Sequence, residues 1–231
     1  MRYYFLRINM SKKAKLYCYE NGSSILIQNY LVRNIHDRNF PNDINIIIHD
    51  FVGYTPKTNS ELKKAINNWC LNKEKSILKY GHISKWNTQN ITNMRYLFYY
   101  KKNMNENISN WIVKNVTDMT GMFQNAEIFN KPLSKWDVSK VKEMNCMFSS
   151  ANSFNQNIKS QNILDKNGNI KYKAWDVSKV RNMNNMFNNA KKFNENLNNW
   201  EVNENTQING MFENTQIIKY HRYKIPKWYK I

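Results

Sequence analysis

The chain has 231 residues, of which 41% are hydrophobic and 14% aromatic, so it is long enough to bury a core and is not a disordered tail. Its formal net charge of +18 suggests a nucleic-acid or membrane-surface partner. However, the basic residues are mostly Lys, and they are spread along a chain that is also rich in Asn, Ile and Tyr. An AT-rich genome produces this bias whatever the function, so the charge alone does not assign one.

Targeting signals and disulfides are not indicated. Residues 1–7 are too short and too polar for a signal-peptide core, and no run of about 18 apolar residues predicts a membrane span. Cys18, Cys70 and Cys146 are odd in number and far apart. They favour a reducing compartment over a disulfide framework or a zinc site. We therefore expect a protein that is not secreted.

Residues 1–54 are predicted as a small α+β region. β-prone runs at 16–19 and 25–27 flank an Asn-Gly turn, which indicates a hairpin. Apolar residues then recur at helical spacing over about 42–52, after Pro41 and before Gly53. This stretch resembles the opening helix of an F-box, a ubiquitin-ligase adapter motif, but we favour an ordinary amphipathic helix.

Residues 55–85 are predicted to form a capping helix. Thr58-Asn59-Ser60-Glu61 is a capping-box pattern at a helix start. A single helix closed by Gly81 would place on one face Leu62, Ile66, Trp69, Cys70 and Ile77. Because this segment directly precedes a repeat array, we expect it to cover the exposed end of that array, with Trp69 as its anchor.

Residues 86–216 contain a repeated unit, which begins at Trp86 and occurs about five times. The steps between the leading tryptophans are 25, 25, 39 and 25 residues, where 39 is one period plus an insertion of 14. Units of this length bury their apolar faces by stacking on neighbours. The predicted core of the stack is Trp86, Trp111, Trp136, Trp175, Trp200, Met119, Met144, Met183, Phe98, Phe123, Phe148, Phe187, Phe212, Phe129, Phe154 and Phe193.

The composition of each unit predicts its local structure. The W-x-V-x-x-V and F-N-x-x-[IL] segments have the composition and length of strands, and M-x-x-M-F-x-x-A suits one helical or 3-10 turn. The Asn after the second aromatic residue recurs as Asn105, Asn130, Asn155 and Asn194. We interpret this column as a structural ladder between coils, with a row of ligand-binding amides as the alternative.

Two segments interrupt or follow the repeat and are candidate contact surfaces. The insertion at 160–173 is predicted as a hairpin with Asn167-Gly168 at its tip, and a calcium loop is disfavoured because later acidic ligands are missing. Residues 217–231 form either a C-terminal cap or a basic-aromatic strip for an acidic or nucleic-acid partner. The candidate partner contacts are Lys166, Asn167, Tyr172, Arg222, Lys224, Lys227, Trp228 and Tyr229.

The repeat W-D-V-S-K-V-x-x-M-x-x-M-F-x-x-A-x-x-F-N-x-x-[IL] resembles that of the BspA-like surface-lipoprotein group, a relative of leucine-rich repeats. The segment T-P-K-T-N-S-E-L-K-K-A-I-N-N-W-C is similar to the head that precedes the repeats in protist and large-DNA-virus versions. The resemblance covers about 55–215. It implies a mainly β, leucine-rich-repeat-like solenoid with a noncatalytic binding role. The absence of a lipoprotein signal departs from the surface-anchored members, and the viral version is the closest fit.

No catalytic constellation is evident in the sequence. The four His residues stand alone, Asp137 and Asp176 occupy one repeat column, and no Gly-rich phosphate loop is present. We expect no enzyme activity, no cofactor and no metal. The leading hypothesis is a virion or host-cytoplasm protein that binds other proteins. The alternatives are a basic nucleic-acid-binding protein and an F-box-like adapter acting through 40–52.

Overall fold

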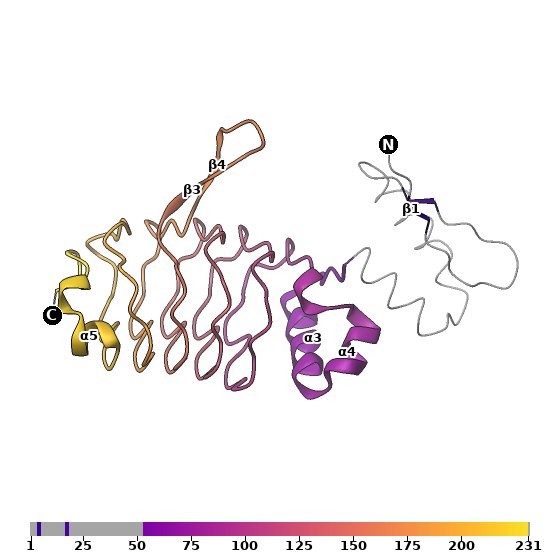
Figure 1. Ribbon diagram of the computed structural model, residues 1–231, viewed down its shortest axis with the longest axis horizontal. Helices are drawn as coiled ribbons and strands as arrows, with labels where there is room; N and C mark the ends of the chain where they lie inside the picture. The colour runs from indigo at the N-terminus through magenta and orange to yellow at the C-terminus, as the bar shows by residue number, and fades with distance from the viewer. Residues whose placement is uncertain (1–3, 6–16, 19–52, 231) are drawn as a thin grey trace, which may run out of the picture.

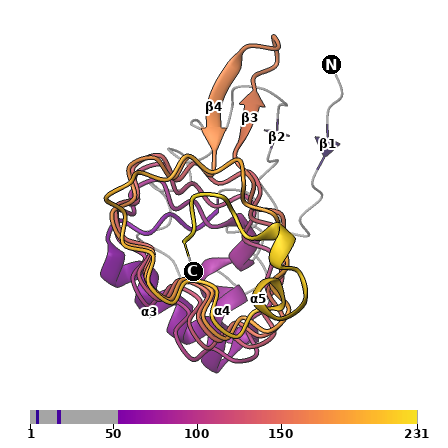
Figure 2. The same cartoon turned by 90° about the vertical axis from the view of Figure 1, so that its left-hand side faces the viewer.

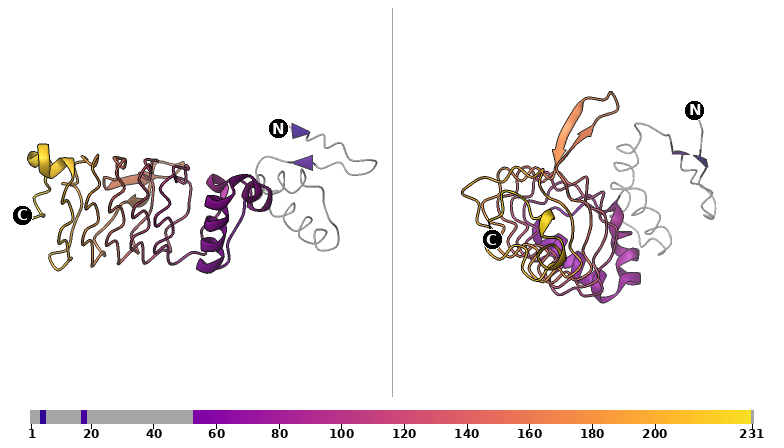
Figure 3. Two further views of the ribbon diagram at one scale, coloured as in Figure 1. Left: turned by 90° about the horizontal axis from the view of Figure 1, so that it is seen from below. Right: turned by 60° about the vertical axis from the view of Figure 1, so that its left-hand side comes forward.

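The computed structural model describes residues 4–5, 17–18 and 53–230. Successive coils of the chain lie side by side along one axis (Figures 1 and 3). Helices α3 (Asn59–Leu71) and α4 (Lys73–Tyr80) lie at the first coil, and helix α5 (Gln216–Tyr220) lies at the last. Viewed along this axis, the coils superimpose in projection (Figure 2). The 25-residue period of the sequence is therefore the length of one coil in the structure.

The N-terminal expectations fall mostly outside the described residues. Strand β1 (Tyr4–Phe5) pairs antiparallel with β2 (Tyr17–Cys18). The second run of the predicted hairpin at 25–27, the predicted helix over 42–52 and the F-box-like stretch at 40–52 all lie outside them.

The predicted capping helix is two helices. Helix α3 spans Asn59–Leu71 and begins as the capping box predicts, because the Thr58 side chain accepts a hydrogen bond from the Glu61 N–H at 3.1 Å. The expectation of one helix closed by Gly81 is wrong. Asn72 is extended (φ −151°), and its Oδ1 accepts from Lys75 N–H to start α4 (Lys73–Tyr80). Cys70 was also expected on the buried face, but it is exposed, and the buried residues of α3 are Leu62, Ala65, Ile66 and Trp69.

A short 3-10 helix, η1 (Ile83–Lys85), leads from α4 into the first coil. Trp69 of α3 is buried against Trp86, with ring centroids 5.9 Å apart in an edge-to-face arrangement. Tyr54 and Tyr80 also contact the Trp86 ring. The helical segment thus covers the first rung of the Trp column with aromatic side chains.

Backbone hydrogen bonds between consecutive coils come from alternate residues. In each of the first four coils, the N–H groups 8, 10, 12 and 14 positions after the Trp donate to carbonyls of the next coil. Gly121 N–H, for example, donates to the Asn145 carbonyl at 2.9 Å. The 14-residue insertion does not disturb the pattern, since Cys146 N–H still reaches Asn184, also at 2.9 Å.

This hydrogen-bonded segment contains two columns of left-handed residues. Ten positions after each Trp stand Tyr96, Gly121, Cys146, Asn185 and Gly210, and fourteen positions after it stand Tyr100, Asn125, Ser150, Asn189 and Asn214, all with φ between 55° and 63°. Only Gly, and to a lesser degree Asn, adopts this conformation readily. The alternation of left-handed residues with tight turns curls the chain and keeps it from extending into strands.

The expected fold class, a mainly β, leucine-rich-repeat-like solenoid, is therefore wrong. In the described part of the chain the strands form two separate antiparallel pairs, β1 with β2 and β3 with β4. The predicted coil strands W-x-V-x-x-V and F-N-x-x-[IL] take turn or irregular conformations. Adjacent coils share single isolated parallel bridges, such as Asn93 with Asp118, and no continuous sheet. The apolar residues of these segments are of types common in strands, but in the structure they are buried while the backbone forms turns or irregular segments.

Stacked side chains fill the interior of the coils. All residues of the predicted repeat core are buried. Phe123 lies between Phe98 and Phe148, with both ring-centroid distances 5.3 Å and interplanar angles of 11° and 2°. Most Trp indoles also donate to a carbonyl of the preceding turn, as Trp111 Nε1–H does to Ile83 at 2.9 Å. Both interactions require a neighbouring coil.

The recurring Asn column is a ladder between coils. The Oδ1 atoms of Asn105 and Asn130 accept from the backbone N–H of Asn130 and Asn155, each at 3.0 Å. Asn155 Oδ1 accepts in turn from Asn194 N–H at 2.8 Å, across the insertion. The side chains are used within the stack, which confirms the structural interpretation of this column.

The insertion forms a hairpin of β3 (Gln161–Leu164) and β4 (Ile170–Ala174), which projects from the side of the stack (Figure 2). Asp165 Oδ1 accepts from Asn167 N–H at 2.8 Å and from Asn169 N–H at 3.0 Å, so this carboxylate serves the turn. The last coil is followed by α5 (Gln216–Tyr220) and the 3-10 helix η2 (Arg222–Lys224).

We predict that Phe123→Ala lowers the free energy of unfolding by about 3–5 kcal/mol, because it empties a fully buried site between two stacked rings. The control Lys140→Ala removes an exposed ammonium that donates only to Asn115 Oδ1, and should cost less than about 0.5 kcal/mol. Equilibrium urea unfolding measures both. Equal losses would contradict a shared stacked core.

We predict that Gly121→Ala is more destabilising than Gly168→Ala by about 1–3 kcal/mol. Both glycines are left-handed, so both variants bear the conformational cost. A Cβ on Gly121 would also lie 2.2 Å from the Tyr96 ring, whereas one on Gly168 would meet nothing within 4 Å. Urea unfolding of the two variants tests this difference, and similar free energies for both would refute the close approach.

Candidate functional site

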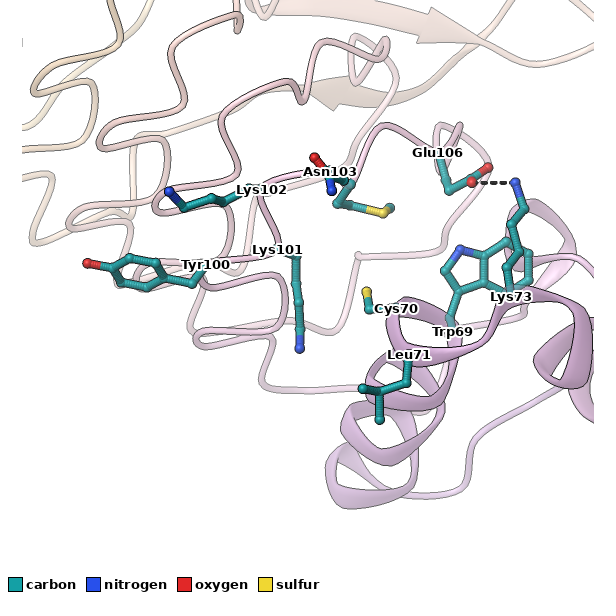
Figure 4. Close-up of a pocket in the computed structure, with 10 residues that line it drawn as sticks. Trp69, Cys70, Leu71, Lys73, Tyr100, Lys101, Lys102, Asn103 and Glu106 are labelled. Atoms are coloured by element: carbon teal, nitrogen blue, oxygen red, sulfur yellow. Dashed lines mark hydrogen bonds and ion pairs between the residues drawn. The ribbon is translucent and has the colours of Figure 1, made fainter.

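A groove of about 420 Å³ lies between the C-terminal end of α3 and the first coil (Figure 4). We call it the N-terminal groove. Its wall on the helix side is Trp69 to Leu71 with Lys73, and its wall on the coil side is Tyr100 to Met104 with Glu106. Sequence reasoning predicted a cap at this place but no groove, because the groove depends on the helix break at Asn72.

Apolar side chains at this groove are exposed. Leu71 is 83% exposed because it is the last residue of α3 and the chain turns away after it. Tyr100 is 54% exposed and Tyr99 42% exposed, and their rings meet edge to face at 4.5 Å. By contrast, every aromatic residue of the repeat core is at most 3% exposed.

The tyrosines of the first coil stand in strained positions. Tyr96 and Tyr100 occupy the two left-handed columns, with φ of 55° and 56°. A left-handed conformation costs a non-Gly residue about 1–2 kcal/mol. Tyr96 packs over Gly121, and Arg95 lies 4.9 Å from the Tyr96 ring centroid. The tyrosine cluster Tyr96, Tyr99 and Tyr100 thus continues the groove onto the coil surface.

The charges at the groove are partly neutralised. Lys73 Nζ pairs with Glu106 at 2.6 Å (Figure 4), and Lys102 Nζ pairs with Glu127 at 2.8 Å. The hydrogen bond to Glu127 raises the pKa of Lys102, so this ammonium stays charged. Lys101 forms no ion pair within the described residues. The groove therefore combines an apolar rim with one available cation.

Cys70 faces the groove but is not an activated nucleophile. Desolvation by the groove walls raises the pKa of its thiol, although the residue as a whole is exposed, and nearby Lys101 offsets this only in part. A raised pKa keeps the sulfur protonated and unreactive at neutral pH.

The histidines were expected to stand alone, but His82 has close partners. Its Nδ1 lies 2.8 Å from Ser84 Oγ, and its Nε2 lies 3.8 Å from Glu106 Oε2. The same Nδ1 accepts from Ser84 N–H at 3.3 Å, so His82 caps η1 and the serine is its neighbour in that turn. At 3.8 Å the carboxylate is beyond hydrogen-bond distance, so it does not orient the imidazole as a catalytic triad requires.

The predicted contacts on the hairpin divide into two groups. Lys166 and Asn167 are exposed at its tip. Tyr172 is instead part of the base, because its hydroxyl donates to the Lys135 carbonyl at 2.7 Å. Lys173 pairs with Glu201 at 2.7 Å, which further fixes the base to the stack.

The predicted contacts near the C-terminus mostly form a cap. Trp228 stacks on Trp200 with a centroid distance of 6.4 Å, and Tyr229 meets Phe212 edge to face at 4.9 Å. Lys224 Nζ donates to the Asn194 carbonyl at 3.1 Å, and Lys227 N–H donates to Asn198 Oδ1. Arg222 is exposed. Trp228 and Tyr229 therefore cover the last coil, whereas Tyr220 and Tyr223 of the same segment are exposed.

The described residues hold no group of three or more His, Cys, Asp or Glu that could bind a metal ion. Asp137 and Asp176 each accept from the backbone N–H two residues on, so both serve turns. No helix in the described part of the chain is long and apolar enough to cross a membrane.

Comparison with family models identifies the repeat. The model of a family described as "Mycoplasma protein of unknown function, DUF285" matches residues 69–168 and 161–228, which together are more than half of the chain. The match begins within α3 and extends to the C-terminal cap. No curated protein and no solved structure matches the chain. The chain belongs to the DUF285 family of BspA-like repeat proteins.

Proposed function

We propose that this protein is noncatalytic and binds another protein through the N-terminal groove and the adjoining tyrosine cluster. The observation that carries the proposal is the exposure of Leu71, Tyr99 and Tyr100 beside a 420 Å³ hollow, whereas every aromatic residue of the repeat core is buried. Tyrosines and aliphatic side chains beside a hollow are typical anchors of protein interfaces.

The strain in this region supports the same proposal. Asn125 and Gly121 show that the two left-handed columns can be filled by residues that tolerate them, yet the first coil has Tyr96 and Tyr100 there. Strained residues of this kind concentrate at binding and switch sites. The edge-to-face contact between Tyr99 and Tyr100 also restricts these rings before binding, which lowers the entropy lost on association.

The groove chemistry favours protein over nucleic acid. Of the basic-aromatic residues that suggested nucleic-acid binding, Lys224 and Trp228 make side-chain contacts within the cap. At the groove, two of the three lysines are paired with glutamates. The exposed apolar side chains of Leu71 and Tyr100 lie beside these paired charges, a mixture that suits a polypeptide partner.

We also propose that the chain represents the version of this repeat found in large DNA viruses and protists, acting in the host cytoplasm or the virion. The AT-rich composition and the head segment at 55–85 support this proposal. Detection of the chain in purified virus particles would support a virion role, and recovery only from uninfected bacterial cells would contradict the viral origin.

We predict that the double variant Leu71→Ser with Tyr100→Asn loses its protein partner at least tenfold in affinity capture from the native source, read by quantitative mass spectrometry. Asn at position 100 tolerates the left-handed backbone, so we expect the variant to lose the tyrosine ring and to keep its fold. About tenfold corresponds to 1.4 kcal/mol, a modest share of an interface anchor.

The matched control is Leu164→Ser with Tyr223→Asn, because these residues are 55% and 77% exposed but lie away from the groove. It should retain the partner. Equal loss in both double variants would contradict a groove-specific interface. Substrate turnover by the purified protein that disappears in Ser84→Ala would contradict the noncatalytic proposal.

A further inference from the structure

Two columns of the repeat are positively charged only in the third and fourth coils. Four positions after the Trp stand Lys140 and Lys179, and six positions after it stand Lys142 and Arg181. The same two columns hold Asn90, Thr92, Asn115 and Thr117 in the first two coils, and Glu204 and Thr206 in the fifth. The repeat therefore folds without these cations, and their placement needs another explanation.

Three of these cations line a surface pocket of about 510 Å³, which we call the basic pocket. It is bounded by Lys142, Lys179 and Arg181 together with Asn203, Asn205 and Gln207 of the fifth coil, and no acidic residue lines it. None of the three cations forms an ion pair with a residue in the described ranges.

The backbone holds two of the cations side by side. Arg181 N–H donates to the Lys142 carbonyl at 2.8 Å, so the two residues are direct neighbours on adjacent coils. Like charges at neighbouring cross-strand positions destabilise a fold. At the corresponding place in the first two coils, Thr117 Oγ1–H donates to the Thr92 carbonyl at 3.2 Å, a neutral and favourable arrangement.

The amides of the pocket add donors. Asn203 Oδ1 already accepts from Asn205 N–H at 2.9 Å, and Gln207 Oε1 accepts from Asn184 Nδ2–H at 3.1 Å. The amino groups of Asn203 and Gln207 donate to no other described residue and are available to a ligand. Ammonium, guanidinium and amide donors that converge without a carboxylate are suited to an anionic ligand that accepts several hydrogen bonds.

We propose that the basic pocket binds an acidic segment of a partner polypeptide, whose Asp or Glu carboxylates are held by Lys142, Lys179 and Arg181. The cationic columns extend over only two coils, which suits a short peptide better than a nucleic-acid track. No aromatic side chain lines the pocket, whereas single-stranded nucleic-acid sites combine cations with aromatic stacking platforms. The proposal goes beyond the groove interface and does not depend on it.

The test measures binding of fluorescein-labelled hexaglutamate to the full chain by fluorescence anisotropy at about 100 mM salt. We expect saturable binding, and a dissociation constant raised at least tenfold in the triple variant Lys142→Gln, Lys179→Gln, Arg181→Gln. The control Lys63→Gln, Lys64→Gln, Lys75→Gln removes the same charge from exposed positions of α3 and α4 and should change it less than about twofold.

Four results would overturn the proposal. The first two are no saturable binding of hexaglutamate and equal weakening of its binding in both triple variants. The third is tighter binding of a thymidine heptanucleotide of matched charge. The fourth is equally large weakening in Arg181→Leu and Arg181→Lys, which would exclude a role for the charge of Arg181. Circular dichroism and thermal unfolding verify that each variant is folded. The groove variant Leu71→Ser with Tyr100→Asn should bind hexaglutamate normally, so failure of the groove interface and failure of this proposal are distinguishable.

Discussion

The structure depends on one set of backbone hydrogen bonds, those from alternate N–H groups of each coil to carbonyls of the next. Four such bonds join each pair of coils, and the left-handed residues ten and fourteen positions after the Trp set their spacing. Because these bonds cross from coil to coil, no single unit can provide hydrogen-bond partners for all of its own backbone N–H and C=O groups. Stacking is therefore a requirement of polar groups as well as of apolar ones.

The side chains follow from that spacing. Once the backbones are fixed, equivalent residues lie above one another, which places Phe123 between two equivalent rings and makes Asn130 accept from the next Asn of its column. The same geometry makes neighbours of Lys142 and Arg181. A residue type that recurs at one position of the repeat therefore forms a continuous row of like side chains. A row of apolar residues forms a core, and a row of cations forms a charged surface. The proposed groove interface lies where Tyr96 and Tyr100 replace Gly or Asn in the left-handed columns, and the proposed basic pocket lies where the two cationic columns meet the fifth coil.

Sequence periodicity predicted the units, their core and the ladder of Asn residues, because these depend on residue type at fixed spacing. It predicted the wrong secondary structure for the coils. Short segments rich in Trp, Val and Ile are typical of strands, and the left-handed positions were not recognised, since Tyr96, Cys146 and Ser150 are not residues that signal them. The column of Gly121 and Gly210 was the available signal. The N-terminal groove was not predictable because a single residue, Asn72, breaks the helix that forms it.

The most direct test of the central claim is native-state hydrogen exchange of individual backbone amides by NMR. Met119, Gly121 and Asn125 donate to the third coil, whereas the equivalent Ile208, Gly210 and Asn214 of the fifth coil have no backbone acceptor among the described residues. If the bonds between coils hold the stack together, the first three amides exchange at least a hundredfold more slowly, a difference of about 2.7 kcal/mol in opening free energy. Equal protection of the two sets would contradict the central claim.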